Sequence, residues 1–312
     1  MDSEDIPLNL SRELLQDSNL IKKMRNILTH RILRFLNEQS KEDEAKFMEF
    51  YKDYNLYFKE AIVRTVDQTE KEEIASLLRF ETNKTEPGVL TSLNDYIKRM
   101  KPDQKNIFFF AAPSRELAIN SPYFEVIKQK DYEILFLFEP YDEMVILQLN
   151  QFHKKNLTGI EQETQAEKNK DDLIIEGDKR SLSNSEAQEL KDWLKKSLGA
   201  KIKNVKINTK LDTHPCVITT ENMGVVRHMI KSNYFQREKI QDFFSMVNLT
   251  MEINPKNGLI KSLHSLQKTN PDLAKDISEQ LLDNSLVSAG LIEDPRLVLS
   301  NLNKLLEKAF SK

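Results

Sequence analysis

The sequence predicts an α/β fold, α+β in its arrangement: a helical segment, a small α/β/α sandwich, and a C-terminal α/β domain that ends in helices. Three observations favour it. Seven glycines in 312 residues leave few tight strand turns and favour helices. Between residues 105 and 140, two continuous apolar runs flank a helix start. Near the end of the chain, asparagine or aspartate followed by proline occurs three times, and each pair marks the start of a helix.

The first part of the chain is helical by its hydrophobic spacing. Apolar residues recur at steps of three and four over residues 11–37. Residues 41–59 repeat the pattern with an aromatic stripe that includes Phe47, Tyr51 and Tyr54. Interleaved lysines and aromatics also occur where proteins stack on nucleic-acid bases. A stripe that packs on a core is the commoner case, and we expect that here.

Residues 105–140 have the pattern of a β-α-β unit. Residues 106–111 and 132–138 are apolar strands, and Ser121 caps a helix with Pro122 at its first position. Strands that are apolar throughout are buried on both faces, as in a parallel sheet covered by helices. Residues 161–182 are polar and weakly patterned, which predicts a linker or mobile loop. We therefore expect one domain over residues 1–160 and a second over residues 183–312.

The second domain contains legible helix and strand signals. Ser183 and Glu186 form a capping box for a helix that ends near Gly199. Residues 202–211 alternate apolar and polar, which predicts a strand with one buried face, and residues 216–219 are expected to be its partner strand. Three helices follow, over about residues 255–268, 271–288 and 295–310, each started by the asparagine- or aspartate-proline pairs.

The last two helices are more apolar than one packed face requires. Two short helices cannot bury such wide apolar arcs against each other, whereas a symmetric bundle formed by two copies buries them. The alternative is that these helices cover the preceding sheet within one chain. For the two-copy case we expect a dimeric four-helix bundle in which these leucines approach their symmetry mates: Leu282, Leu286, Leu302, Leu305 and Leu306.

Composition excludes several classes of protein. Lys+Arg 46 against Asp+Glu 49 gives a net charge of −3, so no basic excess indicates a nucleic-acid partner. Cys216 is the single cysteine, which excludes a disulfide within the chain and a CxxC metal site. No apolar run reaches the roughly 20 residues that a membrane helix needs. The phosphate-binding motifs GxxxxGK[ST] and GxGxxG are both absent from the sequence, and the five histidines are scattered. We therefore expect no metal and no cofactor for this chain, and, without a long apolar run, no membrane insertion.

Arg12 occupies an unusual position. Asn9 or Ser11 caps the helix, so Arg12 lies in its first turn, where a cation opposes the helix dipole. An arginine beside the free amides of a helix start is a good partner for phosphate. The alternative is an ordinary solvated arginine.

Several stretches closely resemble the heat-shock protein 90 chaperone family. Residues 5–16 resemble the specific motif of its middle domain. Further matches lie at residues 77–80, 91–96, 105–109, 121–123, 252–255 and 289–291, so the resemblance covers nearly the whole chain. Residues 211–215 and 222–228 are most similar to the mitochondrial branch of the family. The chain ends in residues 309–312 without the acidic tail of cytosolic members or an endoplasmic-reticulum retention signal.

The resemblance implies an ATP-dependent chaperone that remodels partly folded client proteins as a homodimer. Its nucleotide domain would precede this chain, so we expect this chain alone to be no enzyme and the parent protein to hydrolyse ATP with Mg²⁺. Arg12 would reach the γ-phosphate held by that domain, and Gln16, one helical turn later, is a second candidate. We expect a mitochondrial matrix location, with the cytoplasm as alternative. The competing function is a structural α/β-helical scaffold without an ATP cycle.

Residues 223–247 are the candidate client-binding region. Methionine and phenylalanine side chains rimmed by charge offer adaptable apolar contacts to partly folded chains. The alternative is ordinary packing beneath the last helices. The candidate residues are Met223, Met229, Ile230, Phe243, Phe244 and Met246.

Overall fold

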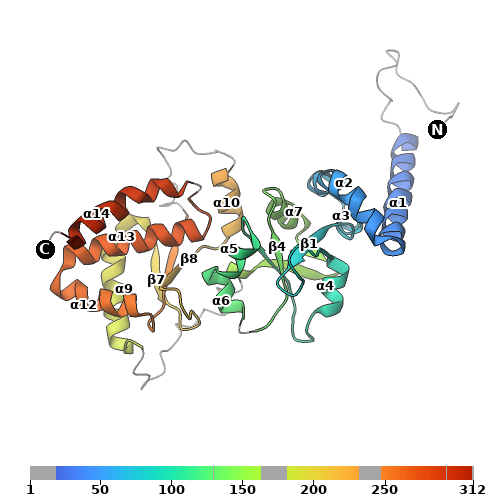
Figure 1. The fold of residues 1–312 in the computed structure, drawn as a ribbon. Coiled ribbons are helices and arrows are strands. Elements are labelled where there is room, and N and C mark those ends of the chain that lie inside the picture. The colour runs from blue at the N-terminus through green and yellow to red at the C-terminus, as the bar shows by residue number, and fades with distance from the viewer. Residues whose placement is uncertain (1–18, 129, 163–180, 232–246, 293, 311–312) are drawn as a thin grey trace, which may run out of the picture.

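The computed structural model describes residues 19–128, 130–162, 181–231, 247–292 and 294–310. Figure 1 shows three parts in a row: helix α1 at one end, an α/β unit in the centre, and a C-terminal α/β domain at the other end. Within the described residues, no helix has both the length and the hydropathy needed to cross a membrane.

The helical segment consists of α1 (Asn19–Glu42), α2 (Glu44–Arg64) and α3 (Gln68–Ala75). Aspartates start the second and third helices: the carboxylates of Asp43 and Asp67 each accept a backbone N–H of the first turn. The aromatic stripe of α2 packs as predicted at Phe47 and Tyr51, which are buried. Tyr54, by contrast, stays half exposed and stacks on a neighbouring ring.

The first sheet has six strands in the order β2-β1-β4-β3-β6-β5. Strand β3 lies parallel to β4 and β6, and the remaining pairs are antiparallel. The predicted β-α-β unit is therefore confirmed, with parallel strands joined through helices. The strands are β1 (Arg79–Thr82), β2 (Thr91–Ser92), β3 (Ile107–Ala111), β4 (Ile134–Leu137), β5 (Gln151–Phe152) and β6 (Lys155–Gly159).

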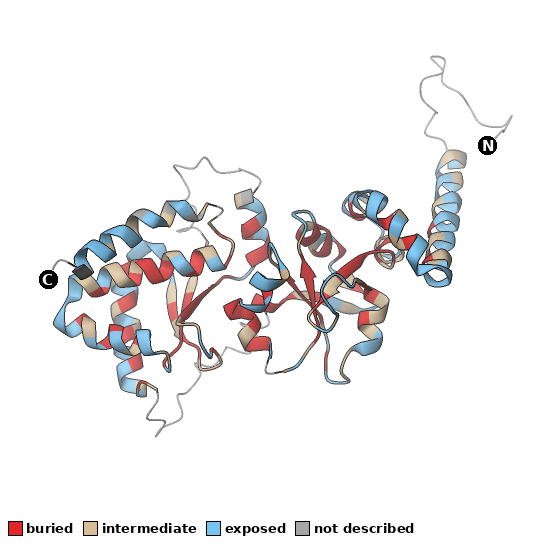
Figure 2. Ribbon diagram, viewed as in Figure 1, coloured by how far each residue is buried: buried red, intermediate tan, exposed pale blue. Residues whose placement is uncertain are grey.

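Alternate residues of β3 and β4 enter two different hydrophobic cores. On one face, Phe108 and Phe136 pack with α5 (Arg115–Ile119), α6 (Pro122–Lys128) and the C-terminal domain. On the other face, Phe109 and Leu135 pack with α2, α3, α4 (Leu93–Arg99) and α7 (Asp142–Leu149). Because side chains alternate along a strand, a run that is apolar at every position serves both faces. Figure 2 shows the strands buried at the centre of this unit.

The C-terminal domain is built around a sheet of three strands. Helix α9 (Asn184–Leu198) has the predicted capping box and ends at Gly199. Strand β9 (Thr250–Ile253) lies between β7 (Asn204–Ile207) and β8 (Cys216–Thr219), parallel to the first and antiparallel to the second. The prediction that residues 216–219 pair directly with residues 202–211 is therefore wrong, because β9 separates them.

The terminal helices begin at two of the three predicted caps. Asn270 caps α13 (Pro271–Ser288), and Asp294 caps a short 3-10 helix, η3 (Pro295–Val298), that leads into α14 (Leu299–Phe310). The cap predicted at Asn254 is wrong, because α12 (Gly258–Thr269) starts at Asn257. The amide of Asn254 instead donates to two carbonyl oxygens of the loop before β8, those of Asp212 and His214.

The predicted linker at residues 161–182 lies mostly outside the described residues. Its described ends are packed: Glu161 is buried, and Leu182 joins the core. That core contains side chains from β3, α6, β8, β9 and α13, so one hydrophobic cluster spans the α/β unit and the C-terminal domain.

Candidate functional site

Helix α10 (Met223–Lys231) lies where the α/β unit meets the C-terminal domain, next to α7 (Figure 1). One face is buried: Met223, Val226 and Arg227 are at most 7% exposed. The opposite face carries Val225 and Met229, each 40% exposed. The helix therefore presents a small apolar surface to solvent while its other face is enclosed.

Arg227 is the centre of a buried ion cluster on the enclosed face. Its Nη2 lies 2.5 Å from Oε1 of Glu143 on α7 and 2.7 Å from Oε1 of Glu161. Its Nε also donates to Glu143, and its Nη1 donates to the carbonyl oxygen of Ala289 at the end of α13 at 3.3 Å. One side chain thus joins α10, the α/β unit and the turn that follows α13.

Burial and charge oppose each other in this cluster. Burial alone lowers the pKa of Arg227, but the charges of Glu161 and Glu143 outweigh it and raise that pKa above its ordinary value. Burial raises the pKa of Glu161, and repulsion from Glu143 adds to it, against the attraction of Arg227. One guanidinium therefore faces two carboxylates, and the net effect on Glu161 is a raised pKa.

A second set of contacts crosses the same junction at α6. Tyr123, fully enclosed, donates its hydroxyl to the carbonyl oxygen of Ile218 on β8. Glu125 accepts the backbone N–H groups of Asp212 and Thr213 and lies 2.8 Å from Nδ1 of His214. Burial acts to raise the pKa of Glu125, but the hydrogen bonds from Thr213 and His214 lower it overall. These contacts place residues 211–215 against the α/β unit.

The leucines predicted for a dimer interface divide into two groups. Leu282 and Leu286 on α13 are buried within the chain's own core. On α14, Leu302 and Leu306 are 36% and 43% exposed, Leu305 is half-buried, and Leu299 adds a further exposed side chain. Of the predicted interface leucines, those with exposed side chains therefore belong to α14.

A cavity of about 440 Å³ lies between α2 and the sheet. It is lined mainly by α2 and the edges of β1 and β4, and Tyr51 and Phe136 are among its walls. In its wall, Lys59 of α2 forms a buried ion pair with Asp142 of α7, with 2.7 Å between Nζ and Oδ1. Burial raises the pKa of Asp142, and Lys59 opposes that rise.

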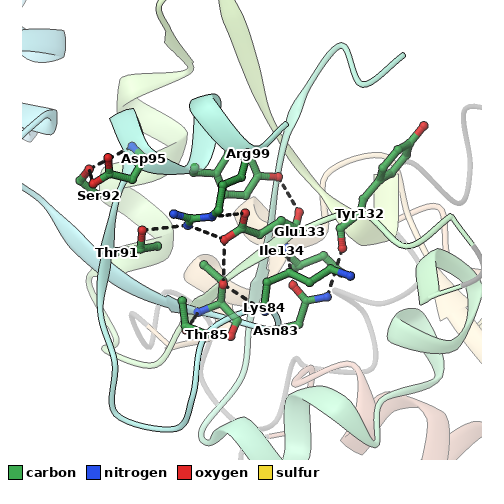
Figure 3. Close-up of polar contacts among 12 residues, drawn as sticks. Asn83, Lys84, Thr85, Thr91, Ser92, Asp95, Arg99, Tyr132, Glu133 and Ile134 are labelled. Carbon is green, nitrogen blue, oxygen red and sulfur yellow. Dashed lines mark hydrogen bonds and ion pairs between the residues drawn. The ribbon is translucent and has the colours of Figure 1, made fainter. Parts of the chain in front are cut away.

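Glu133 organises a polar cluster at the edge of the first sheet (Figure 3). Its carboxylate accepts two hydrogen bonds from Arg99 at 2.7 and 3.0 Å and one from the hydroxyl of Thr82. Arg99 also donates to Thr91, and the hydroxyl of Tyr96 donates to the carbonyl oxygen of Glu133. The cluster fastens α4 to β1 and β4. In the part of the chain that the structure describes, no group of acidic, histidine and cysteine side chains is arranged to hold a metal ion.

The remaining predicted site residues have different outcomes. Arg12, Gln16, Phe243, Phe244 and Met246 lie outside the described residues. Of the predicted client-binding residues on α10, Met229 is exposed, Ile230 is half-buried, and Met223 is buried at 1% exposure.

Comparison with known protein families covers the whole chain. The model of the family described as Hsp90 protein matches residues 1–312, the whole chain. This chain belongs to the heat-shock protein 90 family. The Hsp90 motifs at residues 222–228 and 289–291 meet in the structure, because Arg227 of the first binds Ala289 of the second.

Relatives in this Hsp90 family agree over the full chain. The chain is 42% identical to heat shock protein 75 kDa, mitochondrial, of Bos taurus and 41% identical to that of Rattus norvegicus, over all of this chain and 44% of each relative. It is 37% identical to the chaperone protein HtpG of Desulfitobacterium hafniense, over 99% of this chain and 49% of that protein. The chain thus spans about half the length of the curated relatives that it matches.

Sequence reasoning missed Arg227, Glu143 and Glu161 as a group. Each is a charged residue, and such residues are ordinarily assigned to the surface. One signal was present: Arg227 lies four residues after Met223, on the same face of an amphipathic helix, so an arginine occupies an apolar stripe.

Proposed function

We propose that this chain is the part of an ATP-dependent Hsp90 chaperone that joins two copies and presents a surface to partly folded clients. The observation that carries the proposal is the exposed leucine row of α14, positions 299, 302 and 306, at the free face of the last helix. Leucines spaced by three and four residues form one stripe. A stripe of this kind fits the self-complementary interface of a two-fold dimer.

A second copy is the partner that gains most from that stripe, because a two-fold interface buries each of these leucines twice. The leucines are 36–48% exposed, so each contributes less than half of the about 1.5–3 kcal/mol that full burial of a leucine is worth. Six of them contribute about 4–8 kcal/mol, which is comparable with the lower part of the cost of association, about 4–15 kcal/mol. Leu282 and Leu286 support the interface from beneath, because α13 packs directly against α14.

Client binding is assigned to the exposed face of α10. Val225 and Met229 form a small apolar surface, and His228 on the same side is exposed. Methionine adapts to irregular apolar partners, which suits a surface that must accept many unfolded segments. Phe243, Phe244 and Met246 lie outside the described residues and stay candidates for client binding on their residue type.

The ATP cycle is assigned to the parent protein. Arg12 and Gln16 would act on the γ-phosphate of an ATP-Mg²⁺ complex that the preceding domain binds. The relatives named mitochondrial support a mitochondrial matrix location for this one.

Analytical ultracentrifugation at micromolar concentration tests the proposal. We expect the wild-type chain to sediment as a dimer and the variant Leu302→Glu with Leu306→Glu to sediment as a folded monomer, checked by circular dichroism. The matched control is Leu56→Glu with Tyr57→Glu, which places the same charges on the exposed side of α2. A monomeric wild type, or a double variant that stays dimeric, would refute the assignment to α14.

A further inference from the structure

Three short contacts enclose the Arg227 cluster, and each involves a glycine. A Cβ atom on Gly224 would lie 2.9 Å from Oε1 of Glu143, and one on Gly159 would lie 2.8 Å from Oε2 of Glu161. Gly290, at φ +67°, would place a Cβ 3.3 Å from Cδ of Arg227. The first two distances are shorter than real Cβ contacts, so a larger residue at either glycine would shift the carboxylate of Glu143 or Glu161 from its present place.

The cluster joins elements that are far apart in the sequence. Arg227 and Glu143 are 84 residues apart, and Arg227 and Ala289 are 62 apart. Glu143 belongs to the α/β unit and Glu161 to the segment that follows its last strand, whereas Arg227 and the carbonyl oxygen of Ala289 belong to the C-terminal domain. A planar guanidinium fixes direction as well as distance, because its donors lie in one rigid plane.

Arg227 has three partners, and two of them, Glu143 and Glu161, are buried acidic side chains. The side chains of Arg227, Glu143 and Glu161 are between 2% and 6% exposed. Breaking a buried pair leaves a charge without compensation, so the arrangement holds one geometry and resists others. Val225 and Met229 lie two residues to either side of Arg227, so the orientation of Arg227 sets where both side chains point.

We propose that Arg227 is a positioning residue which, through Glu143, Glu161 and Ala289, fixes the angle of α10 and so presents the Val225–Met229 face to clients. This rests on the proposed function, because it assumes that the face binds clients. Arg227 itself touches no client. Without the cluster, α10 can adopt several angles, and only one of them allows clients to bind. The apparent client affinity then equals the intrinsic affinity multiplied by the fraction of molecules at that angle.

Electron spin-resonance distance measurement tests the positioning directly. Spin labels go on His228→Cys of α10 and Glu116→Cys of α5, both at exposed positions, while Cys216 is buried. Labelled chain is diluted with unlabelled chain so that only distances within one chain are recorded. We expect a single narrow distance for the parent, a distribution at least about twofold wider for Arg227→Gln, and a smaller widening for Glu143→Gln. Arg34→Gln, which removes an arginine from an exposed pair on α1, should leave the distance unchanged.

Client affinity is measured on the same variants with fluorescent, reduced and carboxymethylated α-lactalbumin as the unfolded probe. We expect Arg227→Gln to weaken binding about tenfold, Glu143→Gln less, and Arg34→Gln not at all. Arg227→Lys, which keeps the charge but not the planar fork, should restore part of the affinity and part of the narrow distance.

The two measurements separate two failures. Unchanged distance and unchanged affinity in Arg227→Gln would overturn the positioning role. If Val225→Glu with Met229→Glu keeps full affinity for the probe, α10 is not the client surface and the proposed function itself fails. If Arg227→Gln does not fold, Glu143→Gln decides, since it retains the pair of Arg227 with Glu161; a narrow distance in a folded Glu143→Gln refutes the proposal.

Discussion

Helices α10 and α14 are both amphipathic helices of the C-terminal domain, yet they are held in different ways. The enclosed face of α10 is tied by charged groups that reach another domain. Helix α14 has polar contacts to α13 from Asn301 to Asp283 and from Lys308 to Asp276, while Leu299, Leu302 and Leu306 are exposed. A helix held by buried polar contacts keeps a defined orientation with a small free surface. A helix with a long free apolar stripe needs a partner to cover it.

The largest expected effect concerns ATP hydrolysis, in which neither α10 nor α14 is assigned a role. In the full-length parent protein, Arg12→Ala should lower kcat for ATP about 10³-fold with little change in nucleotide affinity, because an arginine on transition-state charge acts mainly on the chemical step. Steady-state turnover and calorimetry measure the two quantities. Measured without client protein, Val225→Glu with Met229→Glu on α10 and Leu302→Glu with Leu306→Glu on α14 should each change kcat much less than Arg12→Ala does. An unchanged turnover number in Arg12→Ala would mean that Arg12 is an ordinary solvated arginine without a catalytic role.

The α14 stripe should make stability depend on protein concentration. If two copies bury it, Tm rises with concentration by mass action, and the dependence disappears in Leu302→Glu with Leu306→Glu. The double substitution should weaken dimerisation about 10³-fold, because charge must enter an apolar seam. Scanning calorimetry over a hundredfold concentration range measures it. An equal slope in wild type and variant contradicts the role given to α14.

The α10 face should act on clients and leave assembly unchanged. Val225→Glu with Met229→Glu should weaken binding of an unfolded probe by about tenfold, since two partly exposed side chains contribute little over 1 kcal/mol. Sedimentation should still show the wild-type oligomer. If this variant binds the probe normally but dissociates into monomers, α10 belongs to the dimer interface and not to the client surface.

The smallest expected effect is the pH dependence of the α10 anchor. The pKa of Glu161 is raised by burial, so its contribution to the free energy of unfolding is present below the unfolded value, about 4.3, and is lost as pH rises through the folded pKa. Glu161→Gln removes that loss. Its Tm relative to wild type should therefore increase from pH 4 towards pH 8. Thermal scans across this range check the sign, and a relative Tm that falls with pH would contradict the raised pKa.

The sequence predicted those elements whose local pattern agrees with their tertiary environment. Strands β3 and β4 follow from continuous apolar runs, and α13 follows from its asparagine cap. Strand β9 was missed because its Glu252 is charged yet buried. The carboxylate of Glu252 is paired with Asn208 and Thr219, partners that only the folded sheet supplies.

The sequence carried a signal for a buried Arg227 but none for its partners, for the same reason. Local patterns report which face of a helix is apolar, but they do not report which charge on a distant element will meet it. Arg12, Gln16 and the predicted phenylalanines lie outside the described residues, so those site assignments stay predictions.

Helix α7 carries two acidic neighbours that point to different parts of the molecule. Asp142 binds Lys59 of α2, and Glu143 binds Arg227 of α10, both from the first turn of a helix eight residues long. Because both ion pairs leave the same helical turn, α7 joins α2 to α10 through side chains alone, without using a strand of the sheet. The orientation of α7 is therefore shared by two helices from distant parts of the chain.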